Sequence, residues 1–120
     1  MLHRALLAMP WDVQFHPDLA AEVVDMPAVV RVELLAHAGL LEEFGPTLGR
    51  PAVDTLKGSK IANLKELRFG ADGGVWRVTF AFDGNRIAVL LSAGDKRGQA
   101  QARFYKALIA LAERRWASWS

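Results

Sequence analysis

The strongest indication of the fold is the segment Val75-Trp-Arg-Val-Thr-Phe-Ala-Phe-Asp-Gly-Asn-Arg-Ile-Ala-Val-Leu-Leu-Ser92. Apolar and polar residues alternate over residues 75–82, which is the period of a strand whose side chains point to opposite faces. Asp83-Gly84-Asn85 is a strong hairpin signal, and an apolar run follows it. We therefore predict two adjacent antiparallel strands, at 75–82 and 86–92.

The flanking segments extend this hairpin into a domain. A further strand is predicted at 64–69, and a turn at 70–74 joins it to the hairpin. The other elements, in chain order, are a strand at 11–15, helices at 17–24 and 28–44, a long loop at 47–62 and a closing helix at 99–116. The predicted order β-α-α-β-β-β-α describes an α+β domain whose helices pack on one face of an antiparallel sheet.

The helix predicted at 28–44 rests on one apolar stripe. Apolar residues recur at helical spacing, and the acidic residues of the helix are expected to face water. The stripe consists of Val29, Val32, Leu35, Ala36 and Leu40.

Length and composition bound the class of protein. The chain has 120 residues, 52% of them hydrophobic, and no cysteine. We expect one domain over residues 1–120, with residues 1–10 as a mobile N-terminal extension. Disulfides and thiolate-bound metals are excluded, which fits a reducing compartment. No window approaches the roughly 20 apolar residues that span a bilayer, so we expect a cytoplasmic protein that makes no membrane contact.

The net charge of +2 conceals a division along the chain. Residues 12–56 carry eight acidic and two basic side chains, whereas residues 57–106 carry ten basic and four acidic ones. A basic half of this kind predicts a surface for nucleic acid or for another acidic partner. An ordinary solvated face is the alternative that the charge count leaves open.

Strand alternation predicts which charged residues share a face. If Leu67 enters the core, Glu66 and Arg68 lie opposite it and join Arg77 on an open face of the sheet. Arginine suits bidentate phosphate contacts, and the loop residue Lys96 can reach the same rim. From spacing alone, a cross-strand ion pair of little energetic value is the more common meaning of such a cluster.

Several familiar sites are missing from the sequence. His3, His16 and His37 have no metal-ligand spacing. A Walker A loop, a dinucleotide fingerprint and a Gly-x-Ser-x-Gly elbow are also absent. We therefore expect no metal site and no cofactor.

Five segments together carry a family resemblance. They are Gly45-Pro-Thr-Leu-Gly-Arg-Pro51, Val53-Asp-Thr-Leu-Lys-Gly-Ser-Lys60, Asn63-Leu-Lys-Glu-Leu-Arg68, Trp76-Arg-Val-Thr-Phe-Ala-Phe-Asp83, and Gly94-Asp-Lys96 followed by Arg103-Phe-Tyr-Lys106. Each segment alone is weak, but the combination spans nearly the whole chain. It resembles the RelE/ParE superfamily of toxins from toxin–antitoxin modules, above all the HigB-like, phage-related branch.

This resemblance implies a fold, an activity and partners. It implies a ribosome-dependent endoribonuclease, or mRNA interferase, that inhibits translation by cutting mRNA on the ribosome. The implied chemistry needs no metal and consists of attack by the ribose 2′-OH on the adjacent phosphate. The implied partners are the ribosome, mRNA and a small antitoxin, usually a helix-turn-helix protein, which together with the toxin forms a hetero-oligomer.

The resemblance also assigns roles by position. The catalytic positions it implies are Glu66, Arg68, Arg77, Lys96 and Tyr105. Familiar members carry two lysines where this chain has Glu66 and Arg68, and no histidine stands near the closing helix as a ready base. We therefore hypothesise that Glu66 is the general base and that the cations stabilise the developing phosphorane charge. The stripe on which Tyr105 lies favours core packing for that residue.

Four further basic residues of this region are expected to bind RNA phosphates. They are Lys57, Lys60, Lys65 and Arg97. Two other functions remain open on the same fold: a ParE-like gyrase poison without RNA chemistry, and a non-catalytic regulatory binding protein. The full polar cluster favours the nuclease, because ParE-like members usually lack it.

Overall fold

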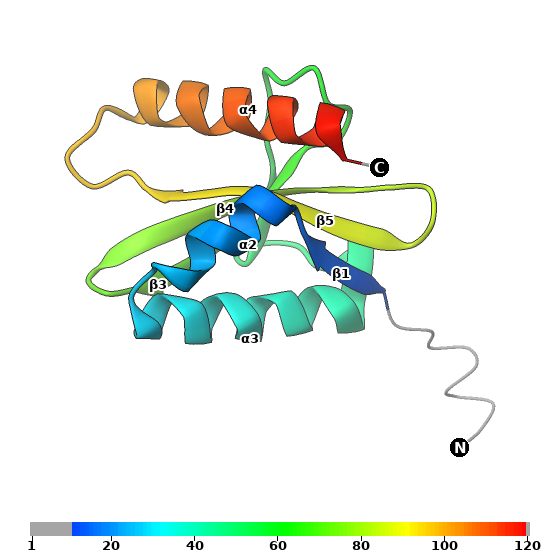
Figure 1. The fold of residues 1–120 in the computed structure, drawn as a ribbon, viewed down its shortest axis with the longest axis horizontal. Coiled ribbons are helices and arrows are strands. Elements are labelled where there is room, and N and C mark those ends of the chain that lie inside the picture. Colours follow the sequence, from blue (N-terminus) through cyan, green and yellow to red (C-terminus); the bar gives the residue numbers. More distant parts are fainter. Residues whose placement is uncertain (1–10, 120) are drawn as a thin grey trace.

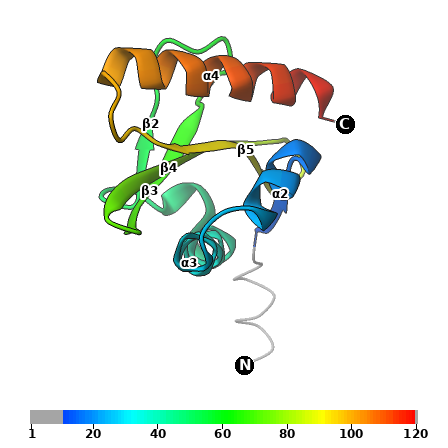
Figure 2. The ribbon, with the colours of Figure 1, turned by 60° about the vertical axis from the view of Figure 1, so that its left-hand side comes forward.

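The computed structural model describes residues 11–119, in which helices cover both faces of a five-stranded sheet (Figures 1 and 2). The strands are β1 (Asp12–Phe15), β2 (Val53–Thr55), β3 (Lys65–Ala71), β4 (Gly74–Phe82) and β5 (Ile87–Asp95), in the spatial order β1-β5-β4-β3-β2. The helices are α2 (Pro17–Val24), α3 (Ala28–Phe44), the 3-10 turn η1 (Gly45–Thr47) and α4 (Gln101–Ser118).

The predicted α+β class is confirmed, but two details of the prediction are wrong. The sheet is mixed, because β1 pairs with β5 in parallel while the other strand pairs are antiparallel. The helices do not share one face: α2 and α3 pack on one side and α4 packs on the other (Figure 1). A short strand, β2, also interrupts the predicted long loop. The expected N-terminal extension lies outside the described residues.

The hairpin between β4 and β5 forms where the sequence places it. The Asp83 carboxylate accepts hydrogen bonds from the backbone N–H groups of Asn85 and Ile87, at 2.8 and 3.1 Å, and so closes the turn. Further along, a bulge shifts the register: Thr79 lies opposite Ser92, whereas Phe80 lies opposite Leu90. The bulge changes which β5 side chains face α4.

The main apolar core lies between the sheet and the helices α2 and α3. Its fully buried side chains are Leu19, Val30, Leu34, Leu41, Leu67, Val78, Phe80, Ala88 and Leu90. A smaller apolar cluster lies under α4 and includes Leu64, Ala81, Val89, Leu91 and Ala112. Each face of the sheet therefore has its own apolar cluster, one under α2 and α3 and one under α4.

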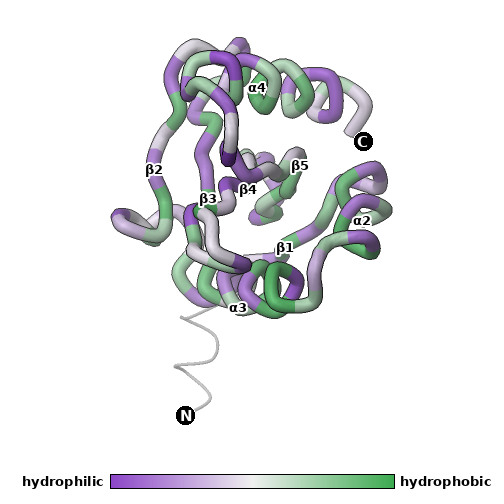
Figure 3. The backbone as a smooth tube through the Cα atoms, turned by 90° about the vertical axis from the view of Figure 1, so that its left-hand side faces the viewer, coloured by the Kyte–Doolittle hydropathy of each residue, from purple (hydrophilic) through white to green (hydrophobic). Residues whose placement is uncertain are grey.

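The stripe on which the prediction of α3 rested is the wrong face of that helix. Val29, Val32 and Leu35 are 54%, 64% and 61% exposed, while Val30 and Leu34 are fully buried. Apolar residues continue around α3 (Figure 3), so periodicity alone does not identify the buried side.

None of the helices in the described part of the chain is long and apolar enough to cross a membrane.

Candidate active site

A polar hollow of about 330 Å³ lies where α4 covers the sheet beside the loop that follows β2. The residues that line it come from β2, β3, β4, this loop and the first turns of α4. They are Asp54, Leu56, Lys57, Glu66, Arg68, Arg77, Gln101, Tyr105 and Ile109. Four of the predicted charged residues and the predicted tyrosine thus share one cavity with side chains from distant parts of the sequence.

Glu66 lies at the centre of the polar contacts in this hollow. It is only 4% exposed, and its Oε1 accepts a hydrogen bond of 2.8 Å from the Tyr105 hydroxyl. The same oxygen lies 3.9 Å from Nε of Arg77. A buried carboxylate of this kind needs such partners, because removing the charge from water is costly.

Burial and pairing shift the titration of both hydrogen-bonded groups. Burial raises the pKa of the Glu66 carboxyl, although the hydrogen bond from Tyr105 and the charges of Arg68 and Arg77 oppose that rise. Burial, followed by the hydrogen bond to Glu66, raises the pKa of Tyr105 to about 12. Tyr105 therefore stays protonated at neutral pH, and the carboxyl group is the better proton acceptor.

Arg77 is a buried cation whose Nε has no hydrogen-bond partner in the described structure. The residue is 7% exposed, and its Nη1 donates to the Val75 carbonyl at 3.2 Å. Its guanidinium carbon lies 5.7 and 5.6 Å from the ring centroids of Phe104 and Tyr105, within the range of cation–π attraction. The aromatic rings hold the guanidinium in place, and its Nε is buried without a hydrogen-bond acceptor.

Arg68 lies directly opposite Arg77 in the β3–β4 register. Like charges in that position repel each other and destabilise the strand pair. Arg68 is exposed and Arg77 is buried, and both line the hollow. A bound phosphate would relieve this repulsion, because it offers negative charge to both guanidiniums.

Asp54 is the main residue of the hollow that the sequence analysis missed. It lies opposite Glu66 in the β2–β3 register, and its charge adds to the rise in the pKa of Glu66. A hydrogen bond from Arg50, 3.0 Å long, lowers the pKa of Asp54 itself. Recognition of the three-residue strand β2 within the predicted loop would have revealed this carboxylate.

The remaining predicted site residues lie in different places. Lys57 lines the hollow. Lys96 and Arg97 line a second hollow of about 180 Å³, which shares Arg77 with the first. The side chain of Arg97 is already paired with Asp95, at 2.6 Å.

Two predicted phosphate ligands lie away from both hollows. Lys65 alternates with Glu66 along β3, and its Nζ donates to Thr55 at 3.0 Å on the other side of the sheet. Lys60 is exposed, and its backbone N–H donates to the Glu113 carboxylate at 2.7 Å. The structure therefore does not bring Lys60 or Lys65 together with the other predicted ligands.

The prediction that Glu66, Arg68 and Arg77 share a face open to solvent is only partly right. α4 covers much of that face, so Thr79 is fully buried and Glu66 and Arg77 are nearly so. Buried hydrogen bonds secure this packing. Ser92 Oγ lies 2.6 Å from Thr79 Oγ1 and donates to the Leu108 carbonyl of α4 at 3.0 Å.

The far half of α4 is held by ionic contacts. Arg115 donates from its two terminal nitrogens to the two Glu22 carboxylate oxygens, at 3.0 and 2.6 Å, and to the Leu91 carbonyl at 2.8 Å. Glu113 accepts hydrogen bonds from Ser59 and from the Lys60 N–H, and the latter is the chief cause of its lowered pKa. These contacts fix the helix that carries Tyr105. Among residues 11–119, no group of three or more His, Asp or Glu side chains is arranged to hold a metal ion.

The fold is that of RelE toxins. An archaeal RelE–RelB complex from Pyrococcus horikoshii OT3 matches 77% of this chain and all of the solved chain, with a TM-score of 0.57 and 21% identity. A doubly substituted mutant of the E. coli toxin RelE, solved in the free state, matches 85% of this chain and 96% of its own, with a TM-score of 0.57 and 14% identity. At these identities the likeness establishes the fold alone.

The sequence of residues 21–117 matches the family described as phage-derived protein Gp49-like (DUF891). The chain belongs to this family, and the predicted RelE/HigB-like kinship is confirmed.

Two Mycobacterium tuberculosis proteins (strain ATCC 25618 / H37Rv) are similar to this chain. The protein named "Putative toxin HigB2" is 49% identical over 67 residues, which are 55% of this chain and 33% of that protein. The protein named "Putative toxin HigB3" is 48% identical over 80 residues, which are 67% of this chain and 68% of that protein. The chain thus spans about a third of the length of the first relative.

Proposed function

We propose that this protein is the toxin of a toxin–antitoxin module and that it cleaves translated mRNA without a metal. Its relatives bear the names of HigB toxins, and its fold is that of RelE. One observation carries the chemical part of the proposal: a buried carboxyl with a raised pKa lies beside two guanidiniums in a polar hollow.

In this mechanism the RNA phosphate binds between Arg68 and Arg77. Glu66 takes the proton of the ribose 2′-OH, and the 2′-oxygen forms a bond to the adjacent phosphorus. The bond from phosphorus to the 5′-oxygen breaks, and that oxygen takes a proton from water. The products are a 2′,3′-cyclic phosphate and a 5′-OH end. The two guanidiniums stabilise the additional negative charge of the phosphorane.

Tyr105 acts through Glu66 in this scheme. Its hydroxyl donates to the carboxylate oxygen, which orients the carboxyl group and opposes the rise in its pKa. Lys57 and Lys96 each line one of the two hollows, and in this mechanism they extend the positive surface that binds the RNA backbone. Binding to that surface should weaken with salt, with a slope of about −0.7 per phosphate contact on a single strand.

The decisive experiment compares two carboxyl-to-amide variants on purified ribosomes programmed with a defined mRNA. Glu66→Gln should cleave about 10²–10⁴-fold more slowly than the wild type, the usual contribution of a general base. Glu43→Gln is the matched control, because Glu43 is exposed on α3, and it should cleave at the wild-type rate. Circular dichroism checks that both variants are folded.

Two outcomes would reject parts of the proposal. Equal cleavage by the wild type and Glu66→Gln would remove Glu66 from the role of base. A wild-type protein that spares translated mRNA but arrests DNA replication first would instead be a gyrase poison of the ParE type.

A further inference from the structure

The hollow under α4 has two chemically different ends. Three residues of α4 line it at intervals of four, so they lie on one face of the helix: Gln101, Tyr105 and Ile109. A helix rises about 1.5 Å per residue, which places Gln101 about 12 Å from Ile109 along the axis. The hollow therefore has an amide end and an aliphatic end, with Tyr105 between them.

The amide end lies beside the two guanidiniums. The Phe104 ring packs against Gly94 of β5, and Gly94 lies opposite Arg77 in the β4–β5 register. Arg77 in turn lies opposite Arg68. The first turn of α4, which carries Gln101, therefore crosses the sheet at the row that holds both guanidiniums.

Glu66 lies between the guanidiniums and the aliphatic end. It comes two residues before Arg68 on β3, so the two side chains share one face of the strand. Two residues before Glu66, Leu64 belongs to the apolar cluster against which Leu56 and Ile109 pack. Along the hollow the order is thus amide, guanidiniums, carboxyl and aliphatic side chains.

This order sets the direction of the RNA in the proposed mechanism. Glu66 takes the proton of the attacking 2′-OH, so the ribose on the 5′ side of the scissile phosphate lies towards the aliphatic end. The attacking and leaving oxygens of a phosphoryl transfer lie roughly in line. The leaving 5′-oxygen and the nucleotide that carries it therefore lie away from Glu66, towards Gln101.

The aliphatic end suits the base on the 5′ side of the scissile phosphate. The volume of the hollow, about 330 Å³, is near the lower limit of ligand pockets, so it matches one nucleotide rather than two. Leu56 and Ile109 are half-buried, and aliphatic side chains of this kind commonly pack against the flat apolar face of a ligand.

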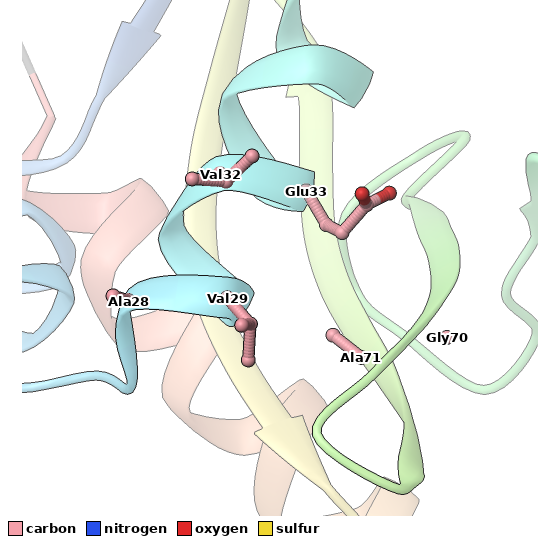
Figure 4. A pocket seen from close by; sticks show the side chains of 6 residues that line it. All are labelled: Ala28, Val29, Val32, Glu33, Gly70 and Ala71. Atoms are coloured by element: carbon pink, nitrogen blue, oxygen red, sulfur yellow. The ribbon is translucent and has the colours of Figure 1, made fainter.

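A larger groove on the other side of the sheet does not offer this combination. It has a volume of about 370 Å³ and lies between α3 and the end of β3 (Figure 4). Glu33 is the only charged residue among the described residues that line it, and a carboxylate repels phosphate. Charge therefore favours the hollow under α4 as the RNA site.

Gln101 is suited to read the base on the 3′ side. It is exposed, and its side chain makes no hydrogen bond to another described residue. Its amide offers both a donor and an acceptor, which pair with N7 and the N6 amino group of adenine. The charged residues of the hollow lack this combination, because a guanidinium only donates and a carboxylate only accepts.

We propose that the hollow binds RNA in one direction, with the 5′ base against Leu56 and Ile109 and the 3′ base at Gln101, which is a specificity-determining residue. The direction rests on the proposed function, because it follows from Glu66 as the general base. The two base contacts themselves can be measured without cleavage.

The binding test uses DNA dinucleotides, which lack the attacking 2′-OH and are not cleaved. One probe has adenine on the 3′ side of the phosphate and an abasic sugar on the 5′ side, and the second probe has the reverse arrangement. Each is titrated into labelled protein up to about 10 mM. Gln101→Ala should weaken binding of the 3′-adenine probe about tenfold and leave binding of the other probe unchanged.

Two further variants complete this test. Gln99→Ala is the matched control, because Gln99 is exposed and lines a different hollow, and it should bind both probes as the wild type does. Ile109→Thr keeps the branched shape but loses apolar surface, so it should weaken only the 5′-adenine probe, about threefold. The proposal is overturned if Gln101→Ala weakens the 5′-adenine probe instead, or if the wild type binds neither probe.

Cleavage mapping tests Gln101 in the complete reaction. On ribosomes programmed with mRNAs that differ at one nucleotide, the wild type should prefer adenine directly 3′ of the cut. Gln101→Ala should reduce this preference about tenfold, and Gln101→Glu should favour cytosine, whose N4 amino group donates to a carboxylate. A changed preference on the 5′ side of the cut would overturn the proposal. A wild type that cuts no mRNA would reject the proposed function, and the dinucleotide titrations would then decide the base contacts alone.

Discussion

The two faces of the sheet are built from the same strands, but the side chains that they bury differ in polarity. On the side of α2 and α3, the buried side chains of β4 are apolar, as at Val78 and Phe80. On the side of α4, β4 buries Arg77 and Thr79. The first interior is held by packing, whereas the second depends on partners for its polar groups. A polar face therefore need not be a solvent-facing one when a helix supplies those partners.

The largest effect should come from the apolar interior. Phe80 is fully buried, and Phe80→Ala should lower the free energy of unfolding by about 3–5 kcal/mol, through lost burial and a residual cavity. Urea denaturation measures this loss. A change below about 1 kcal/mol would show that the α3 side is not the tightly packed interior.

The ionic contact that joins α4 to α2 should contribute less. Arg115 is nearly buried while Glu22 is 46% exposed at its side chain. Glu22→Ala leaves the guanidinium only the more distant Asp18 carboxylate, 4.0 Å from its Nε, and should cost about 1.5–3 kcal/mol, towards the lower end because water reaches Glu22. Arg115→Met should cost less, since no buried charge remains. The reverse order in thermal or urea denaturation would contradict this account.

Adjacent residues on β4 allow a matched swap between the two faces. Thr79→Val removes the acceptor for the Ser92 N–H, 3.1 Å away, and Val78→Thr places a hydroxyl in the apolar interior. Each should destabilise the protein by about 1–3 kcal/mol, although valine and threonine have nearly the same shape. If Thr79→Val is neutral, the polar groups under α4 do not need one another.

The smallest effect is a shift in titration rather than in stability. The chain has one tyrosine, so tyrosinate absorbance reports Tyr105 alone. Its pKa of about 12 should fall in Glu66→Gln, because the hydrogen bond to the carboxylate and its negative charge both favour the protonated phenol. The raised pKa stabilises the fold below about pH 10, and this contribution is lost as the pH rises through about 12. An unchanged value in the variant would place Tyr105 away from Glu66.

Strand alternation predicted the grouping of Glu66, Arg68 and Arg77, because a period of two fixes which side chains share a face. It did not predict what covers that face. The position of α4 depends on contacts between distant segments, such as the hydrogen bond from Ser92 to the Leu108 carbonyl, and no local periodicity of the sequence predicts it. The side of α3 was misassigned for a related reason, because apolar residues surround that helix.

Short and non-local features were the hardest to predict. β2 has three residues, too few for a periodic signal, and with it Asp54 was missed. The parallel pairing of β1 with β5 joins segments between which α2, α3, η1 and the strands β2, β3 and β4 intervene, so the strand was predicted but its partner was not. Lys65 was assigned to RNA binding although its alternation with Glu66 places it on the other side of the sheet.

The pairing of β1 with β5 also constrains the order in which the chain can fold during synthesis. Asp12 pairs with Ile87, so β1 cannot join the sheet until β5, the last strand of the sheet, has been synthesised. Before then, β1 can contact only segments made earlier than β5, as in the bond of 2.9 Å from the Trp11 N–H to the Glu42 carbonyl of α3. Glu66 then gains Tyr105 only after α4 has been translated. A growing chain therefore carries no assembled hollow until its closing helix has been made.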